Sequence, residues 1–474
     1  METKTFELRD EFHRKPIAEK LIRLLSSDID LSPMVIDGGW GTGKTEFCEK
    51  LIALMKQQHA DSYHLVYLDA FRSDHSGEPL LALLAQIIKD CTPEDQANGE
   101  PSAERKQLTR KLAKTAGFSF KVIAKAAVGH FLKQSVEEIA EGWQQAIADE
   151  EGRGAVVETV SDAMVELSDK AIDSTVEVLL KEQIEAEKNL ATLRECLSEF
   201  AENKPIILFI DELDRCRPDY AVDMLETIKH VFDVKNVKVI LITNTQQLRA
   251  AINHRYGLAV DSQRYLDKFL KYSFALPDRS LELYRDDQVL ASVKYFSTLL
   301  KEKIIFENTG LDEKKQENAI SFAQSLIERN ELSLREVETF VRYLEIYQHL
   351  SKGLDLSTTN YGVLLLRIVG VLIFCSNPEI STSIMKGKTN AEQVTRVFGF
   401  SAVPDIRHRY SHVDVIGVLL AWDSAFNNES FFLSEEEASY WLEEKRRLFY
   451  GMWQLPNLFV LIGKVIRTLQ FEQN

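Results

Sequence analysis

Gly38-Gly39-Trp40-Gly41-Thr42-Gly43-Lys44-Thr45 satisfies the pattern G-x-x-x-x-G-K-[ST]. The short apolar run 33–37 precedes it and predicts a buried strand, and one apolar face over 44–56 predicts a helix directly after it. Glycines let the backbone curl so that successive N–H groups point at phosphate oxygens, and the helix N-terminus adds the positive end of its dipole. The stretch therefore predicts a binding site for a phosphate-bearing ligand.

Two side chains of this loop have predicted roles in phosphate chemistry. We expect Lys44 to place its charge between the β- and γ-phosphates and to take part in catalysis, and the Thr45 hydroxyl to ligate Mg²⁺. The predicted nucleotide-binding residues are Gly38, Gly39, Trp40, Gly41, Thr42, Gly43, Lys44, Thr45 and Glu46.

Two acids follow the strongly apolar run 206–210, which predicts a buried strand. Asp211 and Glu212 therefore lie at the carboxyl end of a strand, where open α/β sheets bind their ligands. We expect Asp211 to be a metal ligand and Glu212 to be the general base that activates the attacking water.

A second apolar run, 237–242, ends in Thr243-Asn244-Thr245. A polar side chain at the tip of this neighbouring strand can hold the attacking water or touch the γ-phosphate. We assign that role to Asn244 and keep Thr243 in reserve. A plain turn-forming asparagine is the alternative.

Strand and helix signals alternate along the first half of the chain, which predicts a three-layer α/β core with a parallel sheet. Long helical patterns interrupt this core, and they predict either a structural bundle or a surface for a partner. After Pro277 the chain reads as helical to its end. The predicted parts are an N-terminal helical segment at 1–30, a P-loop NTPase core at 31–277 with a helical insertion at about 103–200, a helical lid at 278–350 and a helical C-terminal domain at 351–474.

Composition narrows the class of protein and its partners. The net charge of −16 disfavours binding to a nucleic-acid backbone, which needs a local excess of Lys and Arg. Five scattered cysteines without a CxxC pair argue against zinc. The apolar stretches 116–132 and 361–375 are interrupted by charges, the second by Arg367, and are better interpreted as buried helices than as membrane spans. We expect a cytoplasmic protein with no membrane attachment.

Taken in order, these motifs and several others resemble the KAP family of P-loop NTPases over about residues 8–345. The Walker B signature Asp211-Glu212-Leu213-Asp214-Arg215-Cys216 is the most specific match. The other matching segments are Phe12-His13-Arg14, the WGTGKT loop, 64–69 with Phe71, 265–268 leading to Pro277, and 332–336. Many members carry transmembrane helices between the two Walker motifs, and many have tryptophan where this chain has Phe71.

The resemblance implies a sheet with an extra strand between the phosphate-loop strand and the Walker B strand. It also implies ATP with Mg²⁺ as the bound species and a catalytic glutamate. The GTP-specific pattern Asn-Lys-x-Asp is absent from the sequence.

Arginines that could bring a positive charge to the γ-phosphate are a separate prediction. Arg335 opens the helix that carries a sensor arginine in related proteins, and it is our first choice. Arg255 and Arg264 lie where related ATPases carry a finger for a neighbouring subunit. Arg215 and Arg217 follow the Walker B acids and could reach the site or pair with Asp214 and Asp219.

These features predict an ATPase that hydrolyses ATP by water attack. The chain has no nuclease, protease or deaminase constellation of its own. The resemblance to soluble prokaryotic members of the family implies a homo-oligomeric regulatory or motor ATPase of bacterial anti-phage defence. Because this chain lacks such a constellation, we expect it to control an effector protein encoded nearby. The alternatives are a nucleotide-locked scaffold or switch with slow hydrolysis and, disfavoured by the charge, an ATP-driven DNA-handling protein.

Overall fold

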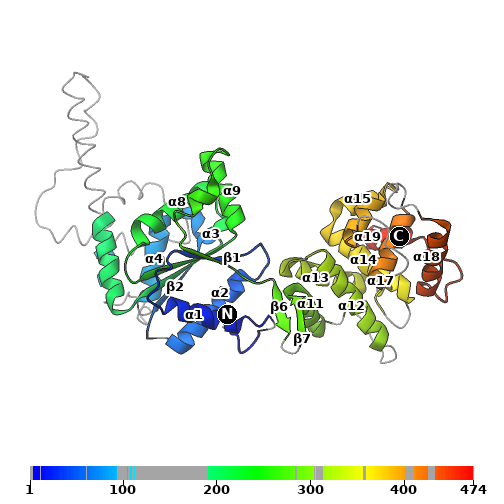
Figure 1. The fold of residues 1–474 in the computed structure, drawn as a ribbon, viewed down its shortest axis with the longest axis horizontal. Coiled ribbons are helices and arrows are strands. Elements are labelled where there is room, and N and C mark those ends of the chain that lie inside the picture. Colours follow the sequence, from blue (N-terminus) through cyan, green and yellow to red (C-terminus); the bar gives the residue numbers. More distant parts are fainter. Residues whose placement is uncertain are drawn as a thin grey trace, which may run out of the picture. The chain divides into compact units, whose positions relative to one another are not determined.

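The computed structural model describes residues 4–10, 12–59, 61–92, 190–282, 285–303, 313–355, 359–400, 410–424 and 433–472, with a few isolated positions besides. The predicted helical insertion at about 103–200, including the apolar stretch 116–132, lies largely outside these residues. The chain separates into two compact units (Figure 1). The first comprises Met1–Asp10, Arg14–Gly39 and Gly43–Leu276, and the second comprises Glu11–His13, Trp40–Thr42 and Pro277–Asn474.

A five-stranded parallel sheet forms the centre of the first unit, in the order β2-β3-β4-β1-β5. Its strands are β1 (Met34–Asp37), β2 (His64–Asp69), β3 (Ile206–Asp211), β4 (Val237–Thr243) and β5 (Tyr272–Ala275). β4 pairs with both β1 and β3 and so lies between them. The extra strand between the phosphate-loop strand and the acidic strand is therefore confirmed.

Helices cover both faces of this sheet because its strands are apolar on both sides. All six residues of β3 are buried. Phe209 faces one hydrophobic core together with α1 and α2, and Leu208 faces the other core together with α4, α8 and α9. Figure 1 shows α1 and α2 on one face of the sheet and α8 and α9 on the other. The predicted three-layer α/β architecture is confirmed.

The helical segments of this unit have the following bounds: α1 (Lys15–Leu25), α2 (Lys44–His59), α3 (Ala70–Ser73), η1 (Asp74–Ser76), α4 (Pro79–Cys91), η2 (Leu213–Arg215), α8 (Pro218–Thr227), η3 (Ile228–Phe232), α9 (Thr245–Tyr256) and α10 (Ser262–Leu266).

The second unit begins with a strand pair, which the sequence analysis did not predict. β6 (Arg279–Glu282) and β7 (Arg285–Leu290) pair antiparallel where we expected helix directly after Pro277. That expectation was wrong because the segment is polar and has no strong period. Pairing between the two strands satisfies their backbone groups, and a single-segment pattern does not reveal this.

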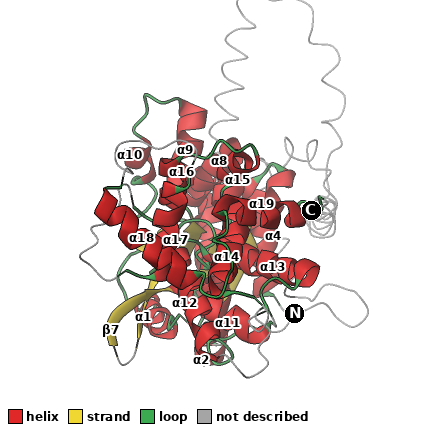
Figure 2. Cartoon of the chain, turned by 90° about the vertical axis from the view of Figure 1, so that its right-hand side faces the viewer, coloured by secondary structure: helices red, strands yellow, loops and turns green. Residues whose placement is uncertain are grey.

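Helices make up the rest of the described part of this unit. They are α11 (Ala291–Glu302), α12 (Glu313–Arg329), α13 (Leu334–Ser351), α14 (Tyr361–Ser376), α15 (Pro378–Met385), α16 (Ala391–Val397), α17 (His412–Trp422), α18 (Glu435–Leu448) and α19 (Leu458–Leu469). Figure 2 colours these segments red as helix, with β7 in yellow.

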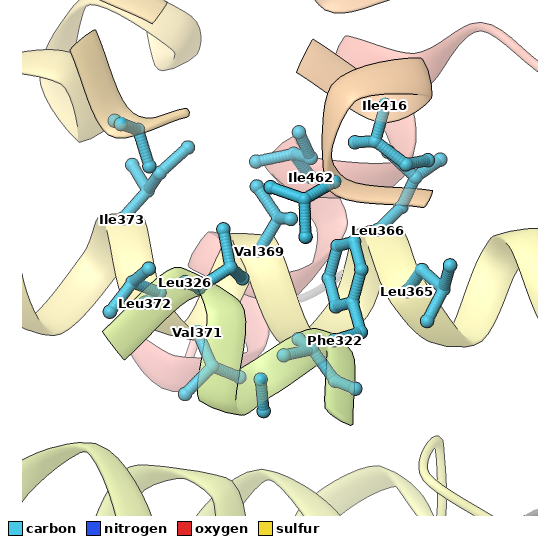
Figure 3. Close-up of a cluster of buried hydrophobic side chains, with 14 of the residues drawn as sticks. Phe322, Leu326, Leu365, Leu366, Val369, Val371, Leu372, Ile373, Ile416 and Ile462 are labelled. Carbon is cyan, nitrogen blue, oxygen red and sulfur yellow. The ribbon is translucent and has the colours of Figure 1, made fainter. Parts of the chain in front are cut away.

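α14 is the central helix of the second unit. Its apolar residues are buried on all sides, and Figure 3 shows them packed against Phe322 and Leu326 of α12, Ile416 of α17 and Ile462 of α19. The interrupting charge, Arg367, donates from Nη1 to the Gly353 carbonyl at 2.5 Å and to the Thr359 hydroxyl at 3.2 Å. The predicted buried helix at 361–375 is therefore confirmed.

Over the described residues, no single helix has the length and apolar character needed to cross a bilayer. In the part of the chain that the structure describes, α14 and α15 reach that threshold only as a pair, and the two helices are bent by 119° relative to each other.

Candidate nucleotide site

The phosphate loop runs from the end of β1 to the start of α2. Gly41 and Gly43 have φ angles of 76° and 80°, in the left-handed region that residues with a Cβ adopt only at a cost. The backbone conformation at these two positions therefore favours glycine, and the loop has the curled backbone predicted from its sequence.

The carboxylate of Asp37 joins the start of this loop to the start of α9. Its Oδ1 accepts from the Gly38 N–H at 2.8 Å and from the Thr245 N–H at 2.9 Å. Its Oδ2 accepts from the Thr245 hydroxyl at 2.7 Å. The sequence analysis gave Asp37 no role, because nothing local indicates that Thr245 lies beside it.

Lys44 lies in the first turn of α2 with only 9% of its surface exposed. Its Nζ donates to the carbonyl oxygens of Gly38 at 2.5 Å and Gly39 at 2.9 Å. Burial lowers the pKa of Lys44, and the negative charges of Asp214, Asp211 and Asp37 oppose that shift. The fold thus brings the loop lysine and the Walker B acid into one electrostatic environment.

Asp211 is the most buried acid of the site, with 1% of its surface exposed. It accepts hydrogen bonds from the Glu212 N–H at 2.8 Å and from the Tyr67 hydroxyl at 3.0 Å. Burial raises the pKa of Asp211 to about 6, although these hydrogen bonds lower it in part. The Thr45 side chain also lowers this pKa, so the two predicted metal ligands, Thr45 and Asp211, lie near each other.

Tyr67 is a site residue that the sequence analysis missed. It lies on β2, which pairs in parallel with β3 so that Asp69 aligns with Asp211. Burial, followed by the charge of Asp211, raises the pKa of the Tyr67 hydroxyl well above its usual range, so that hydroxyl is a donor at neutral pH. Its only sequence signal is its position in a strand, which is equally typical of a packing tyrosine.

Glu212 follows Asp211 in a left-handed conformation, with φ 58° and ψ 25°. This residue begins the short turn η2, in which the Arg215 N–H donates to the Glu212 carbonyl at 3.1 Å. Arg215 Nη1 lies 2.7 Å from Glu212 Oε1. The predicted general base is therefore ion-paired to the arginine three residues later.

The two candidates at the tip of β4 have different contacts. The Thr243 hydroxyl is fully buried and donates to Asp214 Oδ1 at 3.1 Å. Asn244 is the N-cap of α9, and its Oδ1 accepts from the N–H groups of Gln246 and Gln247 at 3.0 and 3.4 Å. This is the turn-forming role that the sequence analysis left open. A role of the Asn244 amide group with the attacking water stays a prediction.

The remaining loop residues are placed as follows. Trp40 is 52% exposed. Glu46 forms an ion pair with Lys50 at 2.8 Å, and Lys50 also donates to the Arg9 carbonyl at 2.6 Å. The Glu46 side chain thus contributes to the packing of α2, and its assignment to nucleotide binding stays a prediction.

Arg335 lies in the first turn of α13 and is exposed. Ser333 and Glu336 form a capping box at this helix start. Within the same unit, the Leu334 N–H donates to the Gly41 carbonyl at 3.0 Å, and a Cβ placed on Gly41 would lie 3.1 Å from Arg335 Cβ. The start of α13 therefore contacts the middle of the phosphate loop.

Three other candidate arginines are ion-paired away from the Walker B acids. Arg217 contacts Asp74 through its Nε at 2.9 Å. Arg255 Nη1 lies 2.5 Å from Asp223 Oδ1, and Arg264 Nε lies 3.2 Å from Asp261 Oδ2.

The donor set suits Mg²⁺ rather than a transition metal. Thr45 supplies a hydroxyl oxygen and Asp211 a carboxylate oxygen, and Mg²⁺ is bound through such hard oxygens together with phosphates and water. Across the described ranges, there is no group of three or more His, Cys, Asp and Glu side chains arranged to hold a metal by themselves. The residues present therefore fit a metal held jointly with a phosphate ligand.

A parallel sheet in this order, a glycine-rich phosphate loop after β1 and paired acids after β3 define a P-loop NTPase. The KAP family P-loop domain matches residues 14–351 of this sequence. The chain belongs to the KAP family, and the resemblance inferred from its motifs is confirmed.

Two similar proteins give the extent of the likeness. The chain is 24% identical over 275 residues to the Phage T7 exclusion protein of Escherichia coli strain K12, a match that covers 55% of this chain and 32% of the relative. The chain therefore matches about a third of that protein's length. The ORC2 protein of Aeropyrum pernix, solved as ADPNP-ADP complexes, is 10% identical with a TM-score of 0.35, covering 97% of this chain and 95% of that one.

Proposed function

We propose that this chain is a Mg²⁺-dependent ATPase. The observation that carries the proposal is the buried carboxylate of Asp211 at the end of β3, near the phosphate loop and directly followed by Glu212. A nearly inaccessible carboxylate beside a loop hydroxyl is costly unless a cation compensates it. We propose ATP rather than GTP as the substrate, because the sequence lacks the GTP-specific pattern Asn-Lys-x-Asp and because the chain belongs to the KAP family.

In the proposed reaction, the loop N–H groups and Lys44 bind the β- and γ-phosphates. Thr45 and Asp211 would hold Mg²⁺, which when bound neutralises charge on the phosphate oxygens. Glu212 accepts a proton from water as the water oxygen bonds to the γ-phosphorus. The bond from the γ-phosphorus to the β,γ-bridging oxygen breaks, and ADP leaves with phosphate. Asn244 orients the water through its amide group.

Two further roles belong to the same proposal. Arg335, at the start of α13, acts as a sensor arginine that responds to the γ-phosphate. It is supported by its place in the family motif and by the contact of its helix with Gly41. Residues 278–350 then act as a lid, and 351–474 form a C-terminal domain.

At the level of the cell, we propose an oligomerising regulatory ATPase of anti-phage defence that controls an effector protein encoded nearby. The name of its relative, the Phage T7 exclusion protein, supports this context. These 474 residues hold no nuclease, protease or deaminase constellation, so in this proposal hydrolysis acts through a partner.

The test is ATP turnover per chain, measured as the protein concentration is raised. Glu212→Gln serves as the blank, and Glu202→Gln, at an exposed position just before β3, is the matched control. We expect turnover that rises with concentration, falls to a small residual rate in Glu212→Gln and is unchanged in Glu202→Gln. Equal turnover in Glu212→Gln and in the unchanged protein would refute the ATPase mechanism, and turnover independent of concentration would refute the need for a neighbouring subunit.

The defence role has a separate test. Cells that express the chain with its neighbouring genes should plate phage less efficiently, and Lys44→Ala should abolish this protection. Protection that survives Lys44→Ala would show that nucleotide binding is not required.

A further inference from the structure

We infer that Arg215 is a positioning residue for hydrolysis, which holds the carboxylate of Glu212 in the direction it needs as general base. The inference rests on the proposed ATPase function. It adds a role to an arginine that the sequence analysis offers either for contact with phosphate or for pairing with Asp214 or Asp219.

The backbone around Glu212 brings the two side chains together. The left-handed conformation of Glu212 ends β3 abruptly, and the chain enters the turn η2. The Arg215 N–H closes the turn onto the Glu212 carbonyl at 3.1 Å, and the Cys216 Sγ lies 3.7 Å from the same oxygen. A non-glycine residue adopts this region only at an energetic cost, so the surrounding contacts must hold Glu212 there.

The far side of the turn is anchored to the sheet. Leu213 is fully buried in the core, and Asp214 accepts a hydrogen bond from the Thr243 hydroxyl of β4 at 3.1 Å. These contacts hold the backbone of Glu212 and Arg215 in place independently of the ion pair between their side chains. This differs from an ion pair on a solvated helix, where fixing two long side chains offsets most of the gain.

The ion pair itself is short and partly sheltered. Arg215 Nη1 lies 2.7 Å from Glu212 Oε1, and the two side chains are 32% and 19% exposed. A guanidinium stays charged at any working pH, so its attraction for the Glu212 carboxylate is present throughout the pH range of the reaction. A carboxylate has about four lone-pair sites, so the ion pair with Arg215 restricts the position of the Glu212 carboxylate and leaves it able to accept a proton.

The arrangement has a direct consequence for the reaction. A general base acts only from within hydrogen-bond reach of its water. A glutamate free to change rotamer would spend part of its time out of that reach. Arg215 restricts the carboxylate of Glu212, so loss of Arg215 should slow the chemical step and leave nucleotide binding unchanged.

The experiment measures kcat and KM for ATP in Arg215→Gln, Arg215→Lys and the matched control Arg447→Gln. Arg447 forms an ion pair of the same spacing and length, 2.7 Å to Glu444, on α18. We expect kcat about tenfold lower in Arg215→Gln with KM unchanged, about threefold lower in Arg215→Lys, and no change in Arg447→Gln.

A second arm separates positioning from structural damage. In a Glu212→Gln background, Arg215→Gln should cause no further loss in single-turnover hydrolysis, because the carboxylate it positions is gone. A further fall of the same size would overturn the inference, since Arg215 would then act independently of Glu212.

Other outcomes also decide the question. An unchanged kcat in Arg215→Gln would show that the pair is incidental, and a higher kcat would show that Arg215 restrains the base; both overturn the inference. A raised KM with unchanged kcat would place Arg215 on the nucleotide instead. Circular dichroism of both Arg215 variants checks the fold, and failure of Arg215→Gln to fold leaves Arg215→Lys as the deciding variant. Absence of Glu212-dependent turnover in the unchanged chain would instead refute the proposed function.

Discussion

Removal of the Asp37 carboxylate should loosen the phosphate loop, and the structure allows the size of the effect to be worked out. The carboxylate accepts three hydrogen bonds, from the Gly38 N–H and from the N–H and hydroxyl of Thr245, at 2.7 to 2.9 Å. A hydrogen bond to a charged group contributes about 1.5–3 kcal/mol. Because Asp37 is only half-buried, water replaces part of this, and Asp37→Ala should cost about 2–4 kcal/mol of unfolding free energy.

Two milder substitutions separate the contributions. Thr245→Val removes the hydroxyl bond alone and should cost about 1 kcal/mol. Asp37→Asn keeps an oxygen for both N–H donors and should lose only the charge assistance, about 1 kcal/mol. This variant also controls for the removal of a negative charge near Lys44, which by itself favours binding of a triphosphate.

The assay is ATP affinity by equilibrium titration, alongside chemical denaturation followed by circular dichroism. We expect Asp37→Ala to weaken ATP binding about tenfold or more, since the loop start is no longer held, and Asp37→Asn to weaken it by less than about threefold. Equal affinities in the Ala and Asn variants would refute the reasoning, because only the Ala variant leaves the two N–H groups without an acceptor.

Two further predictions concern the second unit. Gly370→Ala should lower the free energy of unfolding by about 1–3 kcal/mol, because its Cβ would lie 2.9 Å from Val465 Cβ. Gly463→Ala is the control and should be neutral or stabilising, because a Cβ there would have nothing within 4 Å. Equal melting temperatures of the two variants would contradict the close contact of α14 with α19. Burial lowers the pKa of His412, whose Nδ1 lies 3.1 Å from the Tyr361 hydroxyl, so the unfolded chain binds more protons than the folded chain just below pH ~6.5. Stability from the neutral ring is thus present above pH ~6.5 and falls as the pH drops through the folded pKa. His412→Gln should show a smaller drop in melting temperature between pH ~7.5 and ~5.5, and an equal drop would contradict this assignment.

Features with a local cause could be predicted from the sequence. The phosphate loop could be found because its glycines answer a local backbone requirement, shown by the positive φ of Gly41 and Gly43. The strands β3 and β4 could be found because a strand covered on both faces is mostly apolar, with Lys238 as the one charged residue of β4. The burial of α14 could also be predicted, because Arg367 stands in the middle of its apolar run and a charge there is costly in a membrane span.

Local signals were too weak elsewhere. The β6–β7 pair was missed because a polar strand shows its character only in the presence of its partner. Asn244 shows the same limit at the site. An asparagine at this position suits both capping of α9 and a role with the attacking water, so the sequence does not distinguish the two roles.

The contacts that organise the site join residues far apart in the chain. Asp37 and Thr245 are 208 residues apart, and Tyr67 and Asp211 are 144 residues apart. The sequence alone identifies the phosphate loop, the two acids after β3 and a phosphate-bearing ligand, because each of these predictions depends on a few consecutive residues. The sheet order places β1 beside β4 and β2 beside β3, and only that order brings Asp37 to Thr245 and Tyr67 to Asp211. Hydrogen bonds of this kind depend on distances in space, for which a single chain carries no periodic signal.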